Sequence, residues 1–201
     1  DNPSDNKGHN PEPYFSETVE LMGMIWRLAG AREYNNCNVE SVINSAYLHF
    51  ADVKNHYAVA LARSYWQQGI SYDAVAAYGN QLIFNEHGDL IFDPDYLEGS
   101  NSSFDRWTHQ QKNDMLAAVN DFYKASDFSE WFASTEPEQK LAIASFNSVC
   151  KVDYTWFDTF YGKNDNLSSR IILSFMNGGN NYGNQHQHHH REPRYRRDPR
   201  R

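Results

Sequence analysis

The sequence predicts an α+β fold that is predominantly α-helical, with a helical subdomain, a short β-hairpin and the beginning of a further sheet. Three observations support this class. Apolar side chains recur at helical spacing in most segments, serine and threonine residues stand where helix caps are expected, and two short apolar runs flank a His-Gly turn. The chain has 201 residues, of which 40% are hydrophobic and 15% aromatic, so it can bury one substantial core.

The folded domain is predicted to span residues 14–183. Residues 1–13 contain no large apolar side chain, and we predict a disordered linker there. The first helix begins after Ser16, which has the side chain of an N-cap, and it ends at Gly30. The buried face of this helix comprises Leu21, Met24, Ile25 and Leu28, widened by Met22 and Trp26. Methionines in this pattern are more typical of core packing than of a cofactor site.

Residues 39–69 predict two further helices, which separate near Lys54 and end at a glycine. Ser71 is predicted to cap the helix that follows. The run LIFNEHGDLIF then places two apolar stretches around His87 and Gly88. This arrangement is typical of a β-hairpin.

Two helix starts in the second half of the chain have the spacing of a capping box. Thr108 with Gln111 forms the first, and Thr135 with Glu138 forms the second. Pro137 lies in the first turn of the second helix, where its missing N–H has no partner to lose. Both helices are therefore predicted from local sequence alone.

The apolar run RIILSFM predicts a strand over residues 170–176. One face of this strand would carry Ile171, Leu173 and Phe175, and the other Ile172 and Met176. A strand that is apolar on both faces needs cover on both sides and a partner at each edge. We therefore expect self-association through residues 170–176 if one edge stays open.

The charge distribution argues against nucleic acid as a partner. The net charge is −8, but the last eleven residues carry six arginines and two acidic residues. The rest of the chain therefore holds 12 basic and 24 acidic residues, and such an acidic surface repels phosphate backbones. No run approaches the roughly 18 apolar residues that cross a bilayer. No signal peptide is recognisable in the polar stretch after Asp1.

The sequence assigns no catalytic, cofactor-binding or metal-binding residue. The patterns H-E-x-x-H, G-x-S-x-G, G-x-x-x-x-G-K-[ST] and G-x-G-x-x-G are all missing from the 201 residues. Cys37 and Cys150 allow either one disulfide or two thiols, and buried free thiols are the favoured alternative.

Two histidines are candidate metal ligands. His49 and His56 are seven positions apart, and Glu40 or Asp52 would have to supply a third ligand. The favoured alternative is that both histidines are partly buried and bond to backbone groups. A nucleophile–base pair of Cys150 with either histidine is a weaker hypothesis, because only the fold can join them.

Aromatic side chains and the C-terminal tail offer two further hypotheses. Trp107, Trp131 and Trp156 are candidate stacking platforms for a glycan, although packing in the core is the favoured alternative. Residues 184–201 contain HQHHH and six arginines. We predict that this tail is disordered, chelates metal only loosely and does not belong to the fold.

Four long segments carry a family resemblance. They are YFSETVELMGMIWRLAG, GISYDAVAAYG, FDRWTHQQKNDMLAAVNDFYKASDFSEWFAS and VCKVDYTWFDTFYGKNDNLSSRIILSFMNGGNNYG, all within residues 14–183. These segments resemble the N-terminal part of the family catalogued as domain of unknown function 4932, which occurs mainly in secreted or surface proteins of gut Bacteroidetes. The resemblance implies an extracytoplasmic, bacterial, zincin-like and metallopeptidase-like protein, with zinc bound by full-length members.

The chain departs from the family pattern after Gly183. The family continues into further strands and a helix of the H-E-x-x-H type, whereas this sequence runs into residues 184–201. We therefore predict a truncated N-terminal portion that lacks the zinc motif and is inactive alone, and whether it belongs to an enzyme stays open. The alternative is a peptide- or glycan-binding module with an aromatic-rich surface.

Overall fold

The computed structural model of the chain describes residues 12–36, 39–150 and 170–179. Its α-helices are α1 (Glu17–Leu28), α2 (Glu40–His49), α3 (Tyr57–Gln67), α4 (Asp73–Asn80), α5 (His109–Ala125), α6 (Phe128–Ser134) and α7 (Glu136–Val149). Short 3₁₀ helices are η1 (Arg32–Asn35), η2 (Ala51–Val53) and η3 (Phe104–Arg106). The strands are β1 (Tyr14–Phe15), β2 (Leu82–Phe84), β3 (Leu90–Phe92) and β4 (Ile172–Leu173). The predicted α+β class with mostly helical content is confirmed.

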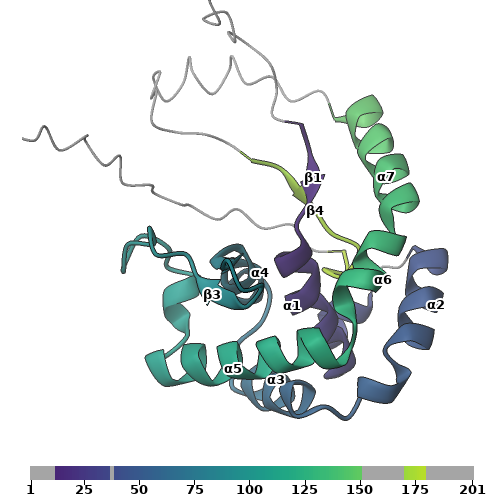
Figure 1. The fold of residues 1–201 in the computed structure, drawn as a ribbon. Helices are drawn as coiled ribbons and strands as arrows, with labels where there is room; N and C mark the ends of the chain where they lie inside the picture. The colour runs from purple at the N-terminus through teal and green to yellow at the C-terminus, as the bar shows by residue number, and fades with distance from the viewer. Residues whose placement is uncertain (1–11, 37–38, 151–169, 180–201) are drawn as a thin grey trace, which may run out of the picture.

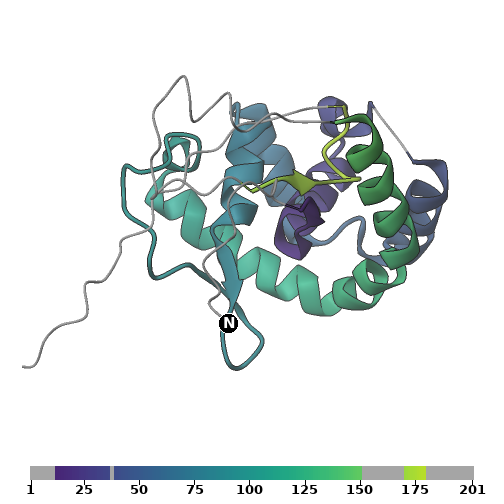
Figure 2. The same cartoon turned by 90° about the horizontal axis from the view of Figure 1, so that it is seen from above.

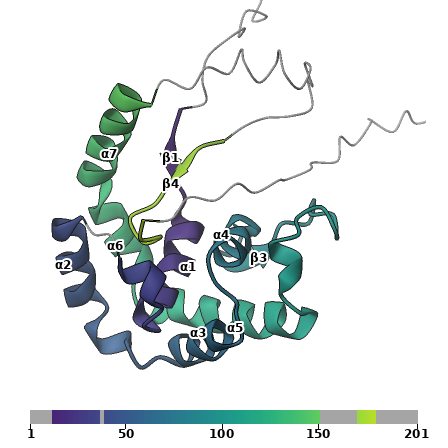
Figure 3. The same cartoon turned by 180° about the vertical axis from the view of Figure 1, so that it is seen from behind.

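Helix α1 lies at the centre of the fold, with α4 on one side and α6 on the other (Figures 1 and 3). Every residue from Thr18 to Arg27 is buried, because neighbouring helices and the segment after β4 pack against this helix. The Oγ of Ser16 accepts a hydrogen bond from the N–H of Val19 at 3.3 Å, and Gly30 follows the helix at φ 85°. Both predicted ends of α1 are thus confirmed.

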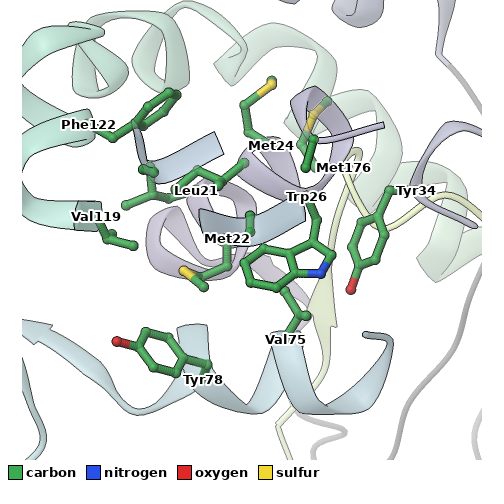
Figure 4. Close-up of a cluster of buried hydrophobic side chains, with 14 of the residues drawn as sticks. Leu21, Met22, Met24, Trp26, Tyr34, Val75, Tyr78, Val119, Phe122 and Met176 are labelled. Carbon is green, nitrogen blue, oxygen red and sulfur yellow. The ribbon is translucent and has the colours of Figure 1, made fainter. Parts of the chain in front are cut away.

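The hydrophobic core gathers around α1 (Figure 4). Met22, Met24 and Trp26 are almost completely buried and share this cluster with side chains from α4 and α5. Each large apolar side chain buried in this way stabilises the fold by about 1.5–3 kcal/mol. The prediction that the two methionines belong to the core is confirmed.

The predicted hairpin is also confirmed. Strands β2 and β3 are antiparallel, and their turn projects from one side of the molecule (Figure 2). Gly88 supplies the positive φ of 77° that the turn requires. On α5, the amide of Asn120 bonds both the N–H of Leu90 at 2.8 Å and its C=O at 2.9 Å. This side chain therefore covers the outer edge of β3 and fixes the hairpin to α5.

The strand predicted over residues 170–176 is much shorter than expected. Only Ile172 and Leu173 are extended, and they pair in parallel with β1. The chain then bends, and the side chains of Phe175 and Met176 are buried within the described part of the chain. These two residues are therefore covered by their own chain, while self-association through the rest of the segment stays a prediction.

Two predicted caps are wrong, the first because of a tertiary contact and the second because of a local one. The hydroxyl of Ser71 donates to the carboxylate of Glu33 instead of capping α4, whose N-cap position is Tyr72 at φ 53°. Thr135 donates to the carbonyl of Phe132 at 2.7 Å, because α6 runs directly into α7. The box of Thr108 and Gln111 at the start of α5 is confirmed.

The N-terminal residues of the described part touch the fold. Pro13 is buried, and the carboxylate of Glu12 accepts a hydrogen bond from Asn147 of α7 at 3.0 Å. The prediction of a disordered linker over residues 1–13 is therefore wrong for these two residues, and residues 1–11 lie outside the described part. None of the described helices has both the length and the apolar character needed to cross a membrane.

Candidate anion-binding pocket

An open pocket lies at the C-terminal end of α1, beside η1, the last turns of α2 and η2. Its volume is about 610 Å³. The lining residues are Arg27, Leu28, Gly30, Arg32, Asn35, Tyr47, Phe50, Ala51 and Lys54. This volume falls within the range of small-molecule sites in proteins.

Local structure positions the pocket wall. Gly30 ends α1 with its positive φ, and the chain turns into η1. The amide of Asn35 then donates to the carbonyl of Ala31 at 2.9 Å and to that of Arg27 at 3.4 Å. These bonds hold η1 against the end of α1, and they thereby place Arg32 at the pocket.

Three cations dominate the chemistry of the pocket. Arg27 is 3% exposed, whereas Arg32 and Lys54 lie on the surface. Neither Arg32 nor Lys54 forms an ion pair with a carboxylate of the described residues. The described lining residues include no carboxylate, imidazole or thiol. The pocket is therefore suited to holding an anion by charge and hydrogen bonds.

Aromatic side chains form an apolar wall beside these cations. Phe50 is fully buried, and its ring centre lies 5.2 Å from that of Trp131. Tyr47 lines the pocket and is 52% exposed, so about half of this residue is accessible to solvent or a ligand. The pocket thus combines an anchored apolar wall with positive charge.

The two histidines considered as ligands do not share a site. His49 Nε2 donates to the carbonyl of Ser126 at 2.7 Å. His56 Nδ1 accepts from the N–H of Ala58 at 3.0 Å, and its Nε2 lies 2.7 Å from a carboxylate oxygen of Asp121. Among the described residues, no three His, Cys, Asp or Glu side chains lie close enough to hold a metal ion.

Cys150 is exposed at the end of α7 and carries a free thiol. The prediction of a buried thiol is therefore wrong for this residue, and Cys37 lies outside the described part. The histidine side chains bond elsewhere, so the structure joins neither His49 nor His56 to this thiol.

The tryptophans proposed as glycan platforms belong to the core. Trp107 and Trp131 are each 2% exposed. The indole N–H of Trp107 donates to the carbonyl of Ala74 at 2.9 Å, and that of Trp131 donates to Ser45 Oγ at 3.2 Å. The platform hypothesis is wrong for these two residues, and Trp156 lies outside the described part.

Sequence reasoning missed the pocket, although one signal for it exists. Residues 14–60 contain three basic side chains, and all three line the pocket. They stand on α1, on η1 and just after η2 with no motif spacing between them. Only the fold reveals that they converge.

The comparisons with known proteins assign no family. No protein-family model, curated protein or solved structure matches the chain. The fold and the pocket define a mostly helical domain with a cationic, partly aromatic cavity.

Proposed function

We propose that this chain is a ligand-binding module whose pocket receives an anionic group attached to an apolar body. The observation that carries this proposal is the convergence of Arg27, Arg32 and Lys54 beside an aromatic wall. Peptides that end in a carboxylate after an aromatic or aliphatic residue have this chemistry. Of the two binding modules considered from the sequence, peptide-binding and glycan-binding, this proposal takes the peptide-binding one.

The buried cation and the two exposed cations of the pocket have different roles. The guanidinium of Arg27 is buried, so its interaction with an anion is less screened by solvent. Arg32 and Lys54 are exposed and draw anions toward the entrance. An arginine can bind a carboxylate with two parallel hydrogen bonds, which orients the ligand.

A peptide suits this pocket better than a neutral glycan. Glycan modules use flat, exposed aromatic rings, whereas Trp107 and Trp131 pack in the core. Tyr47 is the exposed ring of the described pocket wall. A neutral sugar would leave Arg32 and Lys54 without a charged partner among the described residues, and a carboxylate would not.

Charge reversal at the pocket entrance tests the proposal. We expect Arg32→Glu and Lys54→Glu each to weaken binding of the probe acetyl-Gly-Phe-Phe carboxylate about tenfold or more, because each removes one charge-assisted contact. The same peptide with an amidated C-terminus should bind weakly to the parent protein. Binding is measured by NMR shift changes of the pocket residues at low salt.

Lys140→Glu on α7 provides the matched control, because this exposed lysine does not line the pocket. It should bind the probe nearly as tightly as the parent protein does. Equal affinity for the acid and amide peptides, or equal losses in the pocket and control variants, would contradict the proposal.

We further propose that this module is the N-terminal portion of a larger extracytoplasmic, zincin-like protein. The resemblance of the four segments in residues 14–183 supports this. The parallel pair of β1 and β4 is also compatible with it, since further strands can extend so short a sheet. In such a protein, the pocket would bind part of a peptide outside the zinc site.

Residues 1–201 are expected to show no zinc-dependent hydrolysis of casein. A zincin needs fixed metal ligands and a general base beside the bound water, and the sequence lacks the H-E-x-x-H motif that supplies them. Hydrolysis is followed after chelation and after return of zinc. Zinc-restored turnover that persists after deletion of residues 186–190 would overturn this expectation, because that deletion removes the histidine run.

A further inference from the structure

The carboxylate of Glu20 is buried in the middle of the fold and bound by one distant segment. Glu20 is 1% exposed. It accepts hydrogen bonds from the hydroxyl of Ser174, from the N–H of Phe175 at 3.2 Å and from the N–H of Met176 at 3.4 Å. These donors lie more than 150 positions along the chain from Glu20. The carboxyl group of Glu20 thus connects the segment that follows β4 to α1.

The shape of α1 fits this segment. Gly23 lies one turn after Glu20, and a Cβ built there would stand 2.8 Å from the Cβ of Met176. Met176 is fully buried and belongs to the same cluster as Met24 (Figure 4). Gly178 has φ 64°, and its Cα faces the backbone carbonyl of Glu33 on η1. Residues 174–178 are therefore packed closely against α1 and η1.

Burial changes the titration of Glu20. It raises the pKa of this carboxyl from 4.5 to about 7, although the three hydrogen bonds and the charge of Arg27 favour the ionised form. Arg27 is the charged group that acts on Glu20 from its own helix, and the docked segment contributes only a hydroxyl and two N–H groups. The other charged residues on η1, α3, α4 and α6, which pack against α1, are Arg32, Glu33, Arg63, Asp73 and Glu130.

We propose that residues 174–178 form a pH-sensitive latch, which stays docked on α1 while Glu20 is protonated and is released as Glu20 ionises. Release would return the carboxylate to water and remove the cost of burying its charge. It would also free Phe175, whose ring centre lies 4.5 Å from that of Phe15. Glu20 and residues 174–178 do not line the cationic pocket, and the latch does not depend on the proposed function.

The direction of the pH effect follows from linkage. The docked carboxyl holds its proton up to about pH 7, whereas the released carboxyl ionises near pH 4.5. Docking is therefore most favourable below pH 4.5 and weakens as the pH rises through 7. Above that value both states are ionised, and the equilibrium no longer changes with pH.

Amide hydrogen exchange at Phe175 and Met176 measures the opening of the latch. After correction for intrinsic exchange rates, the opening constant should increase roughly tenfold between pH 6 and pH 8.5, as calculated from carboxyl pKa values of 4.5 and about 7. The carboxyl carbon of Glu20 should titrate near pH 7 in the same samples. Titration near 4.5, or corrected exchange that does not change with pH, would overturn the latch.

Glu20→Gln removes the titrating group while keeping one acceptor oxygen. The variant should show corrected exchange at these two amides that is independent of pH. Glu40→Gln makes the same chemical change at an exposed position in the first turn of α2, and it should keep the pH dependence of the parent. If Glu20→Gln does not fold, the carboxyl titration of the parent alone decides the question.

Discussion

Trp107→Ala is expected to lower the free energy of unfolding by about 3–5 kcal/mol, the range typical of removing a buried tryptophan. The ring of Trp107 lies 4.4 Å from that of Tyr78 and 5.7 Å from that of Trp26. Its N–H also satisfies the carbonyl of Ala74. The variant would leave a large cavity between α1 and α4, and the carbonyl of Ala74 would lose the hydrogen bond from the indole.

The exposed ring of Tyr47 provides the control. Tyr47→Ala should cost less than about 1 kcal/mol of stability, since half of this side chain is already in water. Urea unfolding at constant pH measures both variants. Peptide binding should show the opposite order. Tyr47→Ala should weaken binding more than Trp107→Ala does, because Tyr47 lines the pocket. A Trp107→Ala variant of parental stability would show that this ring does not support the core.

Elements with a local cause were predictable from the sequence. The ends of α1 depend on Ser16 and Gly30, which act within a few residues of themselves. The capping box of Thr108 and the turn at Gly88 are local in the same sense. These features need no knowledge of the tertiary fold, and all of them are confirmed.

Two of the wrong predictions involve residues whose partners are distant in sequence. Ser71 bonds Glu33, 38 positions away, and therefore does not cap α4. The residues after Leu173 bend because Glu20 captures their N–H groups. Sequence periodicity describes neither contact, because both depend on how separate elements pack.

The candidate site was less predictable than the fold. In the sequence, an aromatic residue such as Trp107 looks the same whether it packs in the core or binds a ligand at the surface. Only its burial in the fold distinguishes these two roles. Arg27, Arg32 and Lys54 reach one pocket from separate elements, so their spacing in the sequence has no period. A motif search detects fixed spacing and therefore cannot detect this pocket.

Gly79→Ala is expected to destabilise the protein by about 2 kcal/mol, even though alanine is the better helix former. In the interior of an exposed helix, replacing glycine by alanine stabilises by about 1 kcal/mol. At Gly79 the added Cβ would stand 2.8 Å from the backbone oxygen of Thr18 and 2.9 Å from the Cα of Val19. These are backbone atoms of α1, so no side chain can rotate away and the two helices must separate.

The sign of the change distinguishes close helix packing from helix propensity. Ala60→Gly, at an exposed position of α3, makes the reverse substitution without a close contact. It should destabilise by about 1 kcal/mol through propensity alone. If packing of α1 against α4 controls position 79, alanine is the worse residue there and the better one at position 60. Urea unfolding of both variants with unchanged slopes would establish this, and a more stable Gly79→Ala protein would contradict the close approach of the two helices.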